Sequence, residues 1–136
     1  MTLNTTQIPE SCLASVSGST FVNADCFDVF PFIEDKSIDA IICDLPYGTT
    51  QNKWDSVLPL NLIWEQYNRI IKDNGAIILF AQTPFDKVLG ASNLLMLKYE
   101  WIWRKSRPTG HLNANKMPMK AHENILVFYK KPPTFN

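Results

Sequence analysis

Two apolar runs flank a helical pattern in the first half of the chain. Residues 38–43 and 76–80 are nearly continuous apolar runs rich in β-branched side chains. Such runs are typical of strands buried on both faces of a parallel sheet. Between them, over 58–73, apolar residues recur at three- and four-residue spacings, which predicts an amphipathic helix.

Turn and cap signals predict where the helices begin and end. Asn74-Gly75 is expected to stop the first helix, because glycine accepts the left-handed conformation at a helix C-terminus. Thr83-Pro84-Phe85-Asp86 predicts the start of a second helix, with an N-cap, a proline at the first helical position and an acid at the third. This helix is expected to run to about Leu95.

Further strands are predicted at 20–24, 99–103 and 125–129, and 25–33 is expected to be a short helix or turn. Strands alternating with helices predict an α/β fold with a mostly parallel sheet flanked by helices. Ligands of such sheets bind beyond the carboxyl ends of the strands. The Ser/Thr-rich segment 1–19 is expected to be loosely ordered, and 20–136 to form the domain.

Composition narrows the class of protein. The 136 residues suffice for one domain, and 46% hydrophobic with 19% charged residues is typical of a globular chain. Cys12, Cys26 and Cys43 form no C-x-x-C pair, which argues against a disulfide framework, and no metal site is predicted. Cys43 is interpreted as a small apolar residue of a strand. No secretory signal or transmembrane run is recognised, so we expect a cytoplasmic protein.

Charge is divided unevenly along the chain. Residues 1–97 contain five Lys/Arg and eleven Asp/Glu, a net charge of −6, whereas 98–131 contain eight Lys/Arg and two Asp/Glu, a net charge of +6. A basic segment of this kind predicts contact with nucleic-acid phosphates, although a solvated cationic face explains it equally well. The candidate DNA-binding residues are Arg104, Lys105, Arg107, Lys116 and Lys120.

The sequence Asp44-Leu45-Pro46-Tyr47-Gly48 follows the first apolar strand. The Asp44 carboxylate can accept a hydrogen bond from an exocyclic amine, and Pro46 stiffens the turn so that a neighbouring carbonyl can be a second acceptor. Two acceptors would orient the amine and leave its lone pair available for attack on an electrophile. Tyr47 offers a ring on which a flipped base could stack. Asp, Pro and Gly are also ordinary turn formers, so the motif in isolation could simply end a strand.

The wider context of this motif resembles the D-P-P-Y family of amino DNA methyltransferases, in its permuted group, where the catalytic motif precedes the cofactor-binding glycines. The similarity covers nearly all of residues 20–131. Besides 44–47, it rests on the segments Asn23-Ala24-Asp25-Cys26, 36–43, Trp54-Asp55, 72–76, Trp101-Ile102-Trp103-Arg104-Lys105 and His122-Glu123-Asn124-Ile125.

The resemblance implies a partial Rossmann-like S-adenosylmethionine-dependent methyltransferase fold in a protein of a bacterial cell or phage-infected host. It also implies a function and a set of site residues. Asp44, Pro46 and Tyr47 would hold a flipped base of double-stranded DNA, and Asp25 and Asp44 would lie near S-adenosylmethionine. The methyl group would pass directly to adenine N6, because an aspartate at the first motif position favours adenine; cytosine N4 is the alternative. Related enzymes that methylate RNA or a protein glutamine usually have asparagine at that position. By contrast, Trp101 and Trp103 are interpreted as packing residues, and His122 and Glu123 as residues that fix a loop.

Two departures from the family pattern qualify this interpretation. Leu45 replaces the usual proline, which predicts a slightly less rigid turn. The chain also contains no F-x-G-x-G arrangement, the motif with which the family approaches its cofactor. We therefore expect the catalytic-motif half of a methyltransferase domain, completed by a C-terminal portion or a second subunit. The alternative is an inactive or split fragment that only binds DNA or a partner.

Overall fold

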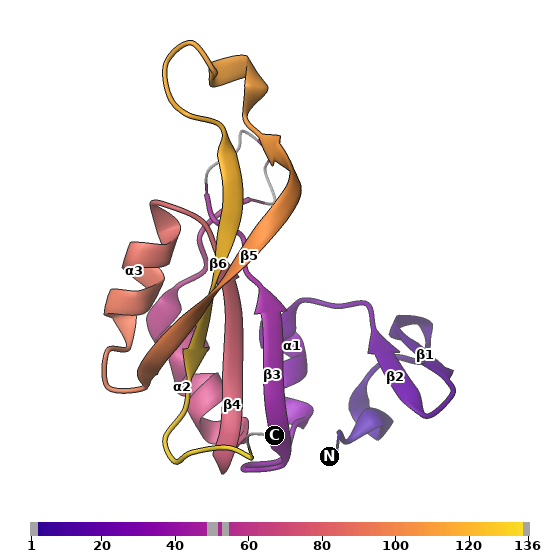
Figure 1. Cartoon of the computed structure of the whole chain (residues 1–136). Coiled ribbons are helices and arrows are strands. Elements are labelled where there is room, and N and C mark those ends of the chain that lie inside the picture. Colours follow the sequence, from indigo (N-terminus) through magenta and orange to yellow (C-terminus); the bar gives the residue numbers. More distant parts are fainter. Residues whose placement is uncertain (1–2, 49–51, 53–54, 135–136) are drawn as a thin grey trace.

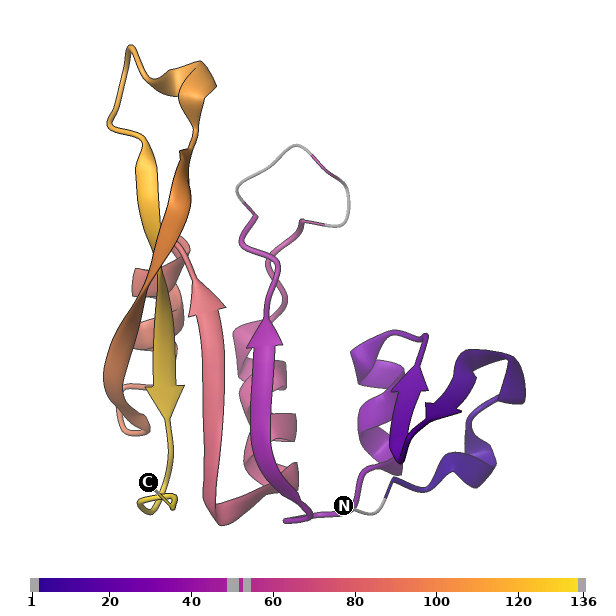
Figure 2. The same cartoon turned by 45° about the vertical axis from the view of Figure 1, so that its right-hand side comes forward.

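A four-stranded β-sheet with two helices on one face forms the centre of the molecule (Figures 1 and 2). The computed structural model describes residues 3–48, 52 and 55–134. The strands follow the order β3-β4-β6-β5 across the sheet. The elements of this part are β3 (Ile38–Asp44), α2 (Leu60–Ile70), β4 (Ile71–Ala81), α3 (Phe85–Ser92), β5 (Leu97–Thr109), the 3-10 turn η4 (His111–Asn113) and β6 (Lys120–Phe128).

The sheet is mixed, which corrects the expectation of a mostly parallel sheet. β3 and β4 are parallel, as predicted, and helix α2 connects them. β6 lies between β4 and β5 and is antiparallel to both. The reason is the connection: β5 returns into β6 through a loop without a crossover helix, and a direct return of this kind reverses the strand direction. The α/β class itself is confirmed.

The hydrophobic core lies between the sheet and helices α2 and α3. Alternate residues of β4 (Ile77, Leu79 and Ala81) are completely buried there. Trp64 of α2 packs on Phe128 of β6 with ring centroids 4.8 Å apart. Burying such side chains stabilises by roughly 1.5–3 kcal/mol each, so this layer fixes how the helices sit on the sheet.

The opposite face of the sheet carries no helix in the described part of the chain. The β3 residues 38–43 are therefore not buried on both faces, contrary to the prediction: Ile42 is exposed and its register partner Ile78 is only partly covered. Trp101 and Trp103 of β5 are likewise exposed, so the expectation that they pack in the core is wrong here.

Helix α2 confirms the amphipathic pattern, but its end differs from the prediction. The helix stops at Ile70, and Asn74-Gly75 lies inside β4. A Cβ on Gly75 would come within 2.8 Å of the Asp39 carbonyl oxygen, so glycine here permits close approach of β3 and not a left-handed turn. Helix α3 starts at Phe85, one residue later than predicted, because Pro84 and not Thr83 is the N-cap residue, and it ends at Ser92, before Leu95.

The N-terminal residues form small elements that the Ser/Thr-rich composition did not predict. Two strands pair as an antiparallel hairpin, and the predicted strand at 20–24 corresponds to the second of them. The predicted helix or turn at 25–33 is present as α1 and η3. The elements are η1 (Thr5–Gln7), η2 (Glu10–Cys12), β1 (Leu13–Val16), β2 (Ser19–Val22), α1 (Cys26–Val29) and η3 (Phe30–Phe32). Among the described residues, no helix is long and apolar enough to span a membrane.

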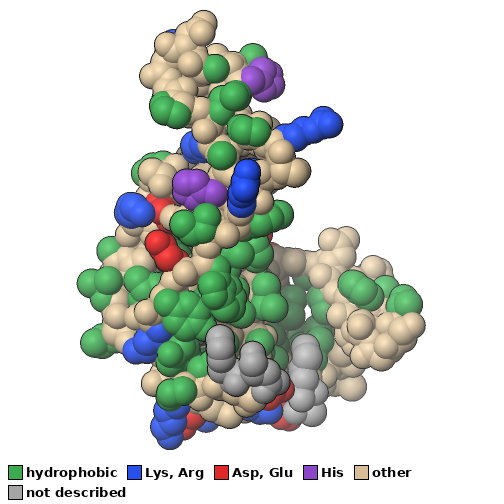
Figure 3. Space-filling model, in the orientation of Figure 1, with side chains coloured by type: hydrophobic (Ala, Val, Ile, Leu, Met, Phe, Trp, Pro, Cys, Tyr) green, Lys and Arg blue, Asp and Glu red, His purple; other side chains and the backbone are tan. Residues whose placement is uncertain are grey.

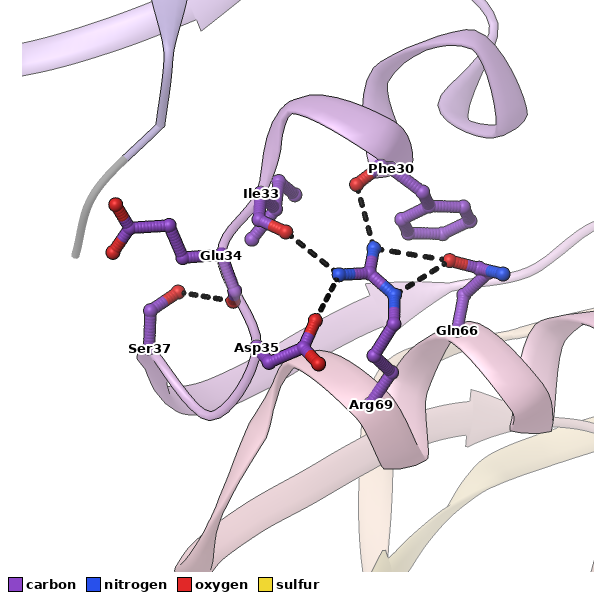
Figure 4. A network of polar contacts seen from close by, with 7 residues as sticks. All are labelled: Phe30, Ile33, Glu34, Asp35, Ser37, Gln66 and Arg69. Carbon is purple, nitrogen blue, oxygen red and sulfur yellow. Dashed lines mark hydrogen bonds and ion pairs between the residues drawn. The ribbon is translucent and has the colours of Figure 1, made fainter.

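Arg69 of α2 connects the segment after α1 to the rest of the domain (Figure 4). Its guanidinium donates to the carbonyl oxygens of Phe30, at 2.7 Å, and Ile33, at 2.8 Å, and to Asp35 Oδ1, at 2.6 Å. Gln66 accepts from the same guanidinium. One side chain thus satisfies two backbone carbonyls and a carboxylate, and it holds α1 and η3 against α2.

Replacing Arg69 by alanine should lower the free energy of unfolding by about 3 kcal/mol, because two partly buried carbonyls and Asp35 lose a charged donor. Arg69→Lys should recover only part of this loss, since an ammonium cannot form the guanidinium fork. Urea unfolding of the variants measures the effect, with Arg104→Ala, an exposed arginine, as the control. Equal stability of Arg69→Ala and Arg104→Ala would contradict the assigned role.

Candidate active site

The Asp44–Gly48 motif lies at the carboxyl end of β3, the position that the sequence predicts. Asp44 is the last strand residue and pairs in register with Phe80 of β4. Leu45 is buried in the core cluster, so the residue that departs from the family pattern packs inward. The turn is held at Gly48, whose N–H donates to Asp55 Oδ1 at 2.8 Å. Gly48 has φ +66°, and a Cβ there would lie 2.7 Å from Val57 Cγ2, so the position requires glycine.

Tyr47 joins the motif to helix α3. Its hydroxyl donates to Asp44 Oδ1 at 2.6 Å, and its ring stacks on Phe85 with centroids 5.4 Å apart and planes 23° apart. Phe85 is buried at the first position of α3. Burial, and then the hydrogen bond to Asp44, raise the pKa of Tyr47, so the side chain stays a neutral phenol and a donor.

The Asp44 carboxylate and one face of the Tyr47 ring can still bind a ligand. The exposed Asp44 carboxylate uses one oxygen for Tyr47, and a carboxylate has acceptor positions for further donors. The stack with Phe85 occupies one face of the Tyr47 ring, so a planar ligand would use the other. The site can therefore accept an amine and present an aromatic surface beside it.

Asp25 lies at the N-cap of α1, exposed, and its carboxylate accepts the Phe27 N–H at 2.9 Å. Burial, and then the Asp25 carboxylate, raise the pKa of the neighbouring Cys26 thiol, with a smaller contribution from Cys43. Phe27 of α1 and Cys43 of β3 both pack against the core cluster. The residues that the resemblance assigns to the cofactor, Asp25 and Asp44, thus belong to elements that pack on the same core.

Residues 103–123, here called the arm, comprise the outer parts of β5 and β6, which pair with each other beyond the end of β4, and the η4 turn between them. The arm projects past the end of the sheet (Figures 1 and 3), and the cationic candidates on it divide into two groups. Arg104, Arg107 and Lys116 are exposed. Lys105 instead forms an ion pair with Glu123 across the two strands. Lys120 Nζ donates to Gln82 Oε1 at 2.7 Å and to the Thr83 carbonyl at 3.3 Å, so it braces the arm against the end of β4.

Two further features near the motif escaped the sequence analysis. Phe85, the residue under Tyr47, had only a place in a predicted cap. Asp86 is buried beside it and accepts from Asn124 Nδ2 at 2.7 Å and Lys87 Nζ at 2.8 Å. Burial would raise the pKa of Asp86, but the Lys87 and Asn124 hydrogen bonds outweigh it and lower the pKa. The Thr83-x-x-Asp86 spacing was the available signal for this bond network.

Other predicted residues can also be located. Glu123 does tie the arm together, through Lys105. Asp55 holds Gly48, whereas Trp54 lies outside the described residues. Within 3–48, 52 and 55–134 there is no cluster of His, Cys, Asp and Glu suited to a metal ion.

Comparison with solved structures identifies the class of fold. The chain superposes on the crystal structure of the M1.HpyAVI-SAM complex with a TM-score of 0.61 and 21% identity, covering 84% of this chain and 56% of that one. It superposes on the PvuII DNA methyltransferase (cytosine-N4-specific) with a TM-score of 0.67 and 11% identity, covering 85% and 50%. The fold is that of the S-adenosylmethionine-dependent methyltransferases.

Sequence comparison gives a more particular relationship. The chain is 31% identical over 125 residues to the type II methyltransferase M1.MboII of Moraxella bovis, covering 82% of this chain and 46% of that protein. No family model matches. The chain is thus similar in sequence to a type II methyltransferase, and it spans about half the length of the relatives it matches.

Phe85→Leu tests whether the stack positions Tyr47. The change keeps an apolar side chain, so it should cost only about 1 kcal/mol of stability. The Tyr47 ring protons should lose the ring-current shift caused by Phe85, as measured by NMR. Val88→Ala, an exposed position of the same helix, is the control and should leave Tyr47 unchanged. Unaltered Tyr47 resonances in Phe85→Leu would disprove the contact.

Proposed function

We propose that this chain supplies the base-holding half of a DNA methyltransferase that transfers a methyl group from S-adenosylmethionine to the exocyclic amino group of a flipped base, in the first place adenine N6. The observation that carries the proposal is the arrangement at the end of β3, where the Asp44 carboxylate, the Tyr47 hydroxyl and the Tyr47–Phe85 stack meet. The similarity to M1.MboII, a type II methyltransferase, supports a role in restriction and modification.

The geometry suits an aromatic amine. A base removed from the duplex would stack on the ring face of Tyr47 that Phe85 does not cover, an interaction worth about 1–3 kcal/mol. Its amino group would donate to Asp44 and to a carbonyl beside Pro46. Those hydrogen bonds would draw the N–H groups aside and leave the nitrogen lone pair pointing at the methyl donor. The buried Phe85 contributes by keeping the ring from turning away.

The residues present fit one end of the cofactor. Asp25 and Asp44 are exposed carboxylates on elements that pack on the same core, and such groups suit the positively charged and hydroxyl-bearing parts of S-adenosylmethionine. When bound, the cofactor would supply a sulfonium methyl group to the amino nitrogen: the sulfur–methyl bond would break as the nitrogen–methyl bond forms, S-adenosylhomocysteine would leave, and one proton would pass from the nitrogen to solvent. Asp44 orients the amine and stabilises the positive charge that develops on it. A glycine-rich loop would come from the half of the domain that this chain does not span.

Cytosine N4 is the second candidate acceptor. The chain shares its fold with a methyltransferase named as cytosine-N4-specific, at 11% identity. Both bases present an exocyclic amine to the same acceptors. The aspartate at position 44 favours adenine in our proposal, and analysis of the methylated nucleoside distinguishes the two.

Asp44→Ala in the completed enzyme should reduce methyl transfer by at least about a hundredfold, because the amine loses its main acceptor. Asp44 is exposed, so folding should be unaffected. Radiolabelled methyl transfer to duplex DNA followed by nucleoside analysis measures both rate and product. The matched control is Asp28→Ala, an exposed acid on α1. Normal transfer by a folded Asp44→Ala enzyme would refute the proposed function.

Arg104, Arg107 and Lys116 should contact DNA phosphates, since they are exposed on the arm. Replacing all three by alanine should weaken duplex binding. It should also reduce the slope of log affinity against log salt concentration by roughly three, because three phosphate contacts are lost. Lys105→Met should instead destabilise the arm, because Glu123 loses its partner, and should leave the salt slope nearly unchanged. Fluorescence anisotropy at several salt concentrations separates these effects. Identical slopes for the triple variant and the parent would exclude phosphate contact.

A further inference from the structure

A cavity of about 450 Å³, here called the arm cavity, lies where the arm passes the end of β4. The turn between β4 and α3 lines it with Gln82 and Pro84. The arm lines it with Thr109, Asn113 and Met117. This volume falls within the range of roughly 300–1,000 Å³ that is typical of sites for small organic groups. The base-holding motif makes no use of this space.

Hydrogen bonds hold both walls of the arm cavity in place. Lys120 Nζ donates to Gln82 Oε1 at 2.7 Å and to the Thr83 carbonyl at 3.3 Å, which joins the arm to the end of β4. Within the arm, the Asn113 carbonyl accepts the Met117 N–H at 3.0 Å, so the two lining residues are held in one turn. The cavity is therefore formed in the protein alone, and a ligand needs to order little of it on binding.

The groups that line the arm cavity suit the edge and the face of a nucleobase. In the described part of the chain, the Asn113 amide and the Thr109 hydroxyl have no hydrogen-bond partner. Gln82 gives its oxygen to Lys120 and keeps its amide nitrogen as a donor. A side-chain amide offers a donor next to an acceptor, which is the pattern that pairs with N6 and N7 of adenine. Met117 adds apolar surface against which a ring can lie.

Charge and position indicate a base of DNA as the occupant. No acid is among the described residues that line the cavity, so it does not suit a metal ion or another cation. The exposed cations Arg107 and Lys116 lie within two residues of lining positions, where they can bind phosphates while a base enters. Pro84 lines the cavity, and the next residue, Phe85, stacks on Tyr47. The cavity and the motif therefore share one turn.

We propose that the arm cavity binds a second base of the recognised DNA site, near the flipped base, and that the Asn113 amide reads the edge of this base, in the first place as adenine. The inference rests on the proposed function, because that function makes DNA the ligand. It goes further by assigning residues that select the DNA sequence. Asp44 and Tyr47, by contrast, act on the base that is methylated.

The test is a selection from a pool of DNA duplexes with random base pairs around a central adenine, which is mispaired in half of the pool and paired in the other half. The fraction that the 136-residue chain binds is sequenced and aligned. Adenine should be enriched at one fixed position near the centre, roughly 5- to 150-fold, which is the discrimination expected of one bidentate amide contact.

Asn113→Ala should abolish this enrichment. Asn115→Ala is the matched control, because Asn115 is an exposed asparagine of the same loop that does not line the cavity, and it should keep the enrichment. Circular dichroism should show the parent fold in both variants, since both side chains are exposed. No enrichment by the parent chain, the same enrichment by Asn113→Ala, or an equal loss in both variants would overturn the proposal.

The same selection separates this proposal from the proposed function. Asp44→Ala should remove the preference for the mispaired half of the pool and keep the enrichment that depends on Asn113. If the parent chain binds both halves equally but still selects a base through Asn113, only the proposed function fails. If the chain prefers the mispaired half through Asp44 but selects no neighbouring base, only the assignment of the arm cavity fails.

Discussion

The parallel pairing of β3 with β4 brings the ends of both strands to one edge of the sheet, and the candidate site depends on it. With Asp44 in register beside Phe80, the chain leaving β4 begins α3 directly under the turn that follows β3. Phe85 can then stack on Tyr47, whose hydroxyl reaches back to Asp44. A slip of one residue in this register would turn Asp44 toward the helical core and separate the ring from its support.

The register is itself maintained by burial on the helix-covered face. Ile77 and Leu79 are completely buried there, whereas their neighbours Ile78 and Phe80 face the open side. Burial on the helix-covered face therefore determines which side chains of β3 and β4 face the helices and which face the opposite side of the sheet. The helix-free face contributes less to stability, because Ile42 and Trp101 remain exposed on it.

The sequence could predict features set by local pattern. The helical periodicity at 60–70, the strands and the position of the Asp44 motif all follow from short-range spacing of side chains. It could not predict that β6 inserts antiparallel between β4 and β5, or that β3 is half exposed, since both depend on which elements the chain contains as a whole. Gly75 is an example, because a glycine suits either the end of a helix or the close approach of two strands. The sequence around Gly75 does not show that the backbone of Asp39 lies against it. Phe85 likewise gave no local sign that it supports Tyr47.

The roles of the basic residues also could not be predicted from the sequence. The arm holds exposed cations beyond the sheet, whereas Lys105 and Lys120, which lie in the same basic segment, bind Glu123 and Gln82 of the protein itself. The arm would thus bring phosphates near the motif, and the motif would take the base. Neither step requires the cofactor, so base holding can be examined in this chain directly.

The most direct test measures affinity of the chain for two DNA duplexes, one fully paired and one with a single mispaired adenine. Unpairing reduces the cost of flipping by a few kcal/mol, so a base-holding site should bind the mispaired duplex about tenfold or more tightly. Tyr47→Ala and Asp44→Ala should each abolish this preference and keep the salt-dependent affinity. Equal affinity of the unmodified chain for both duplexes would contradict the account.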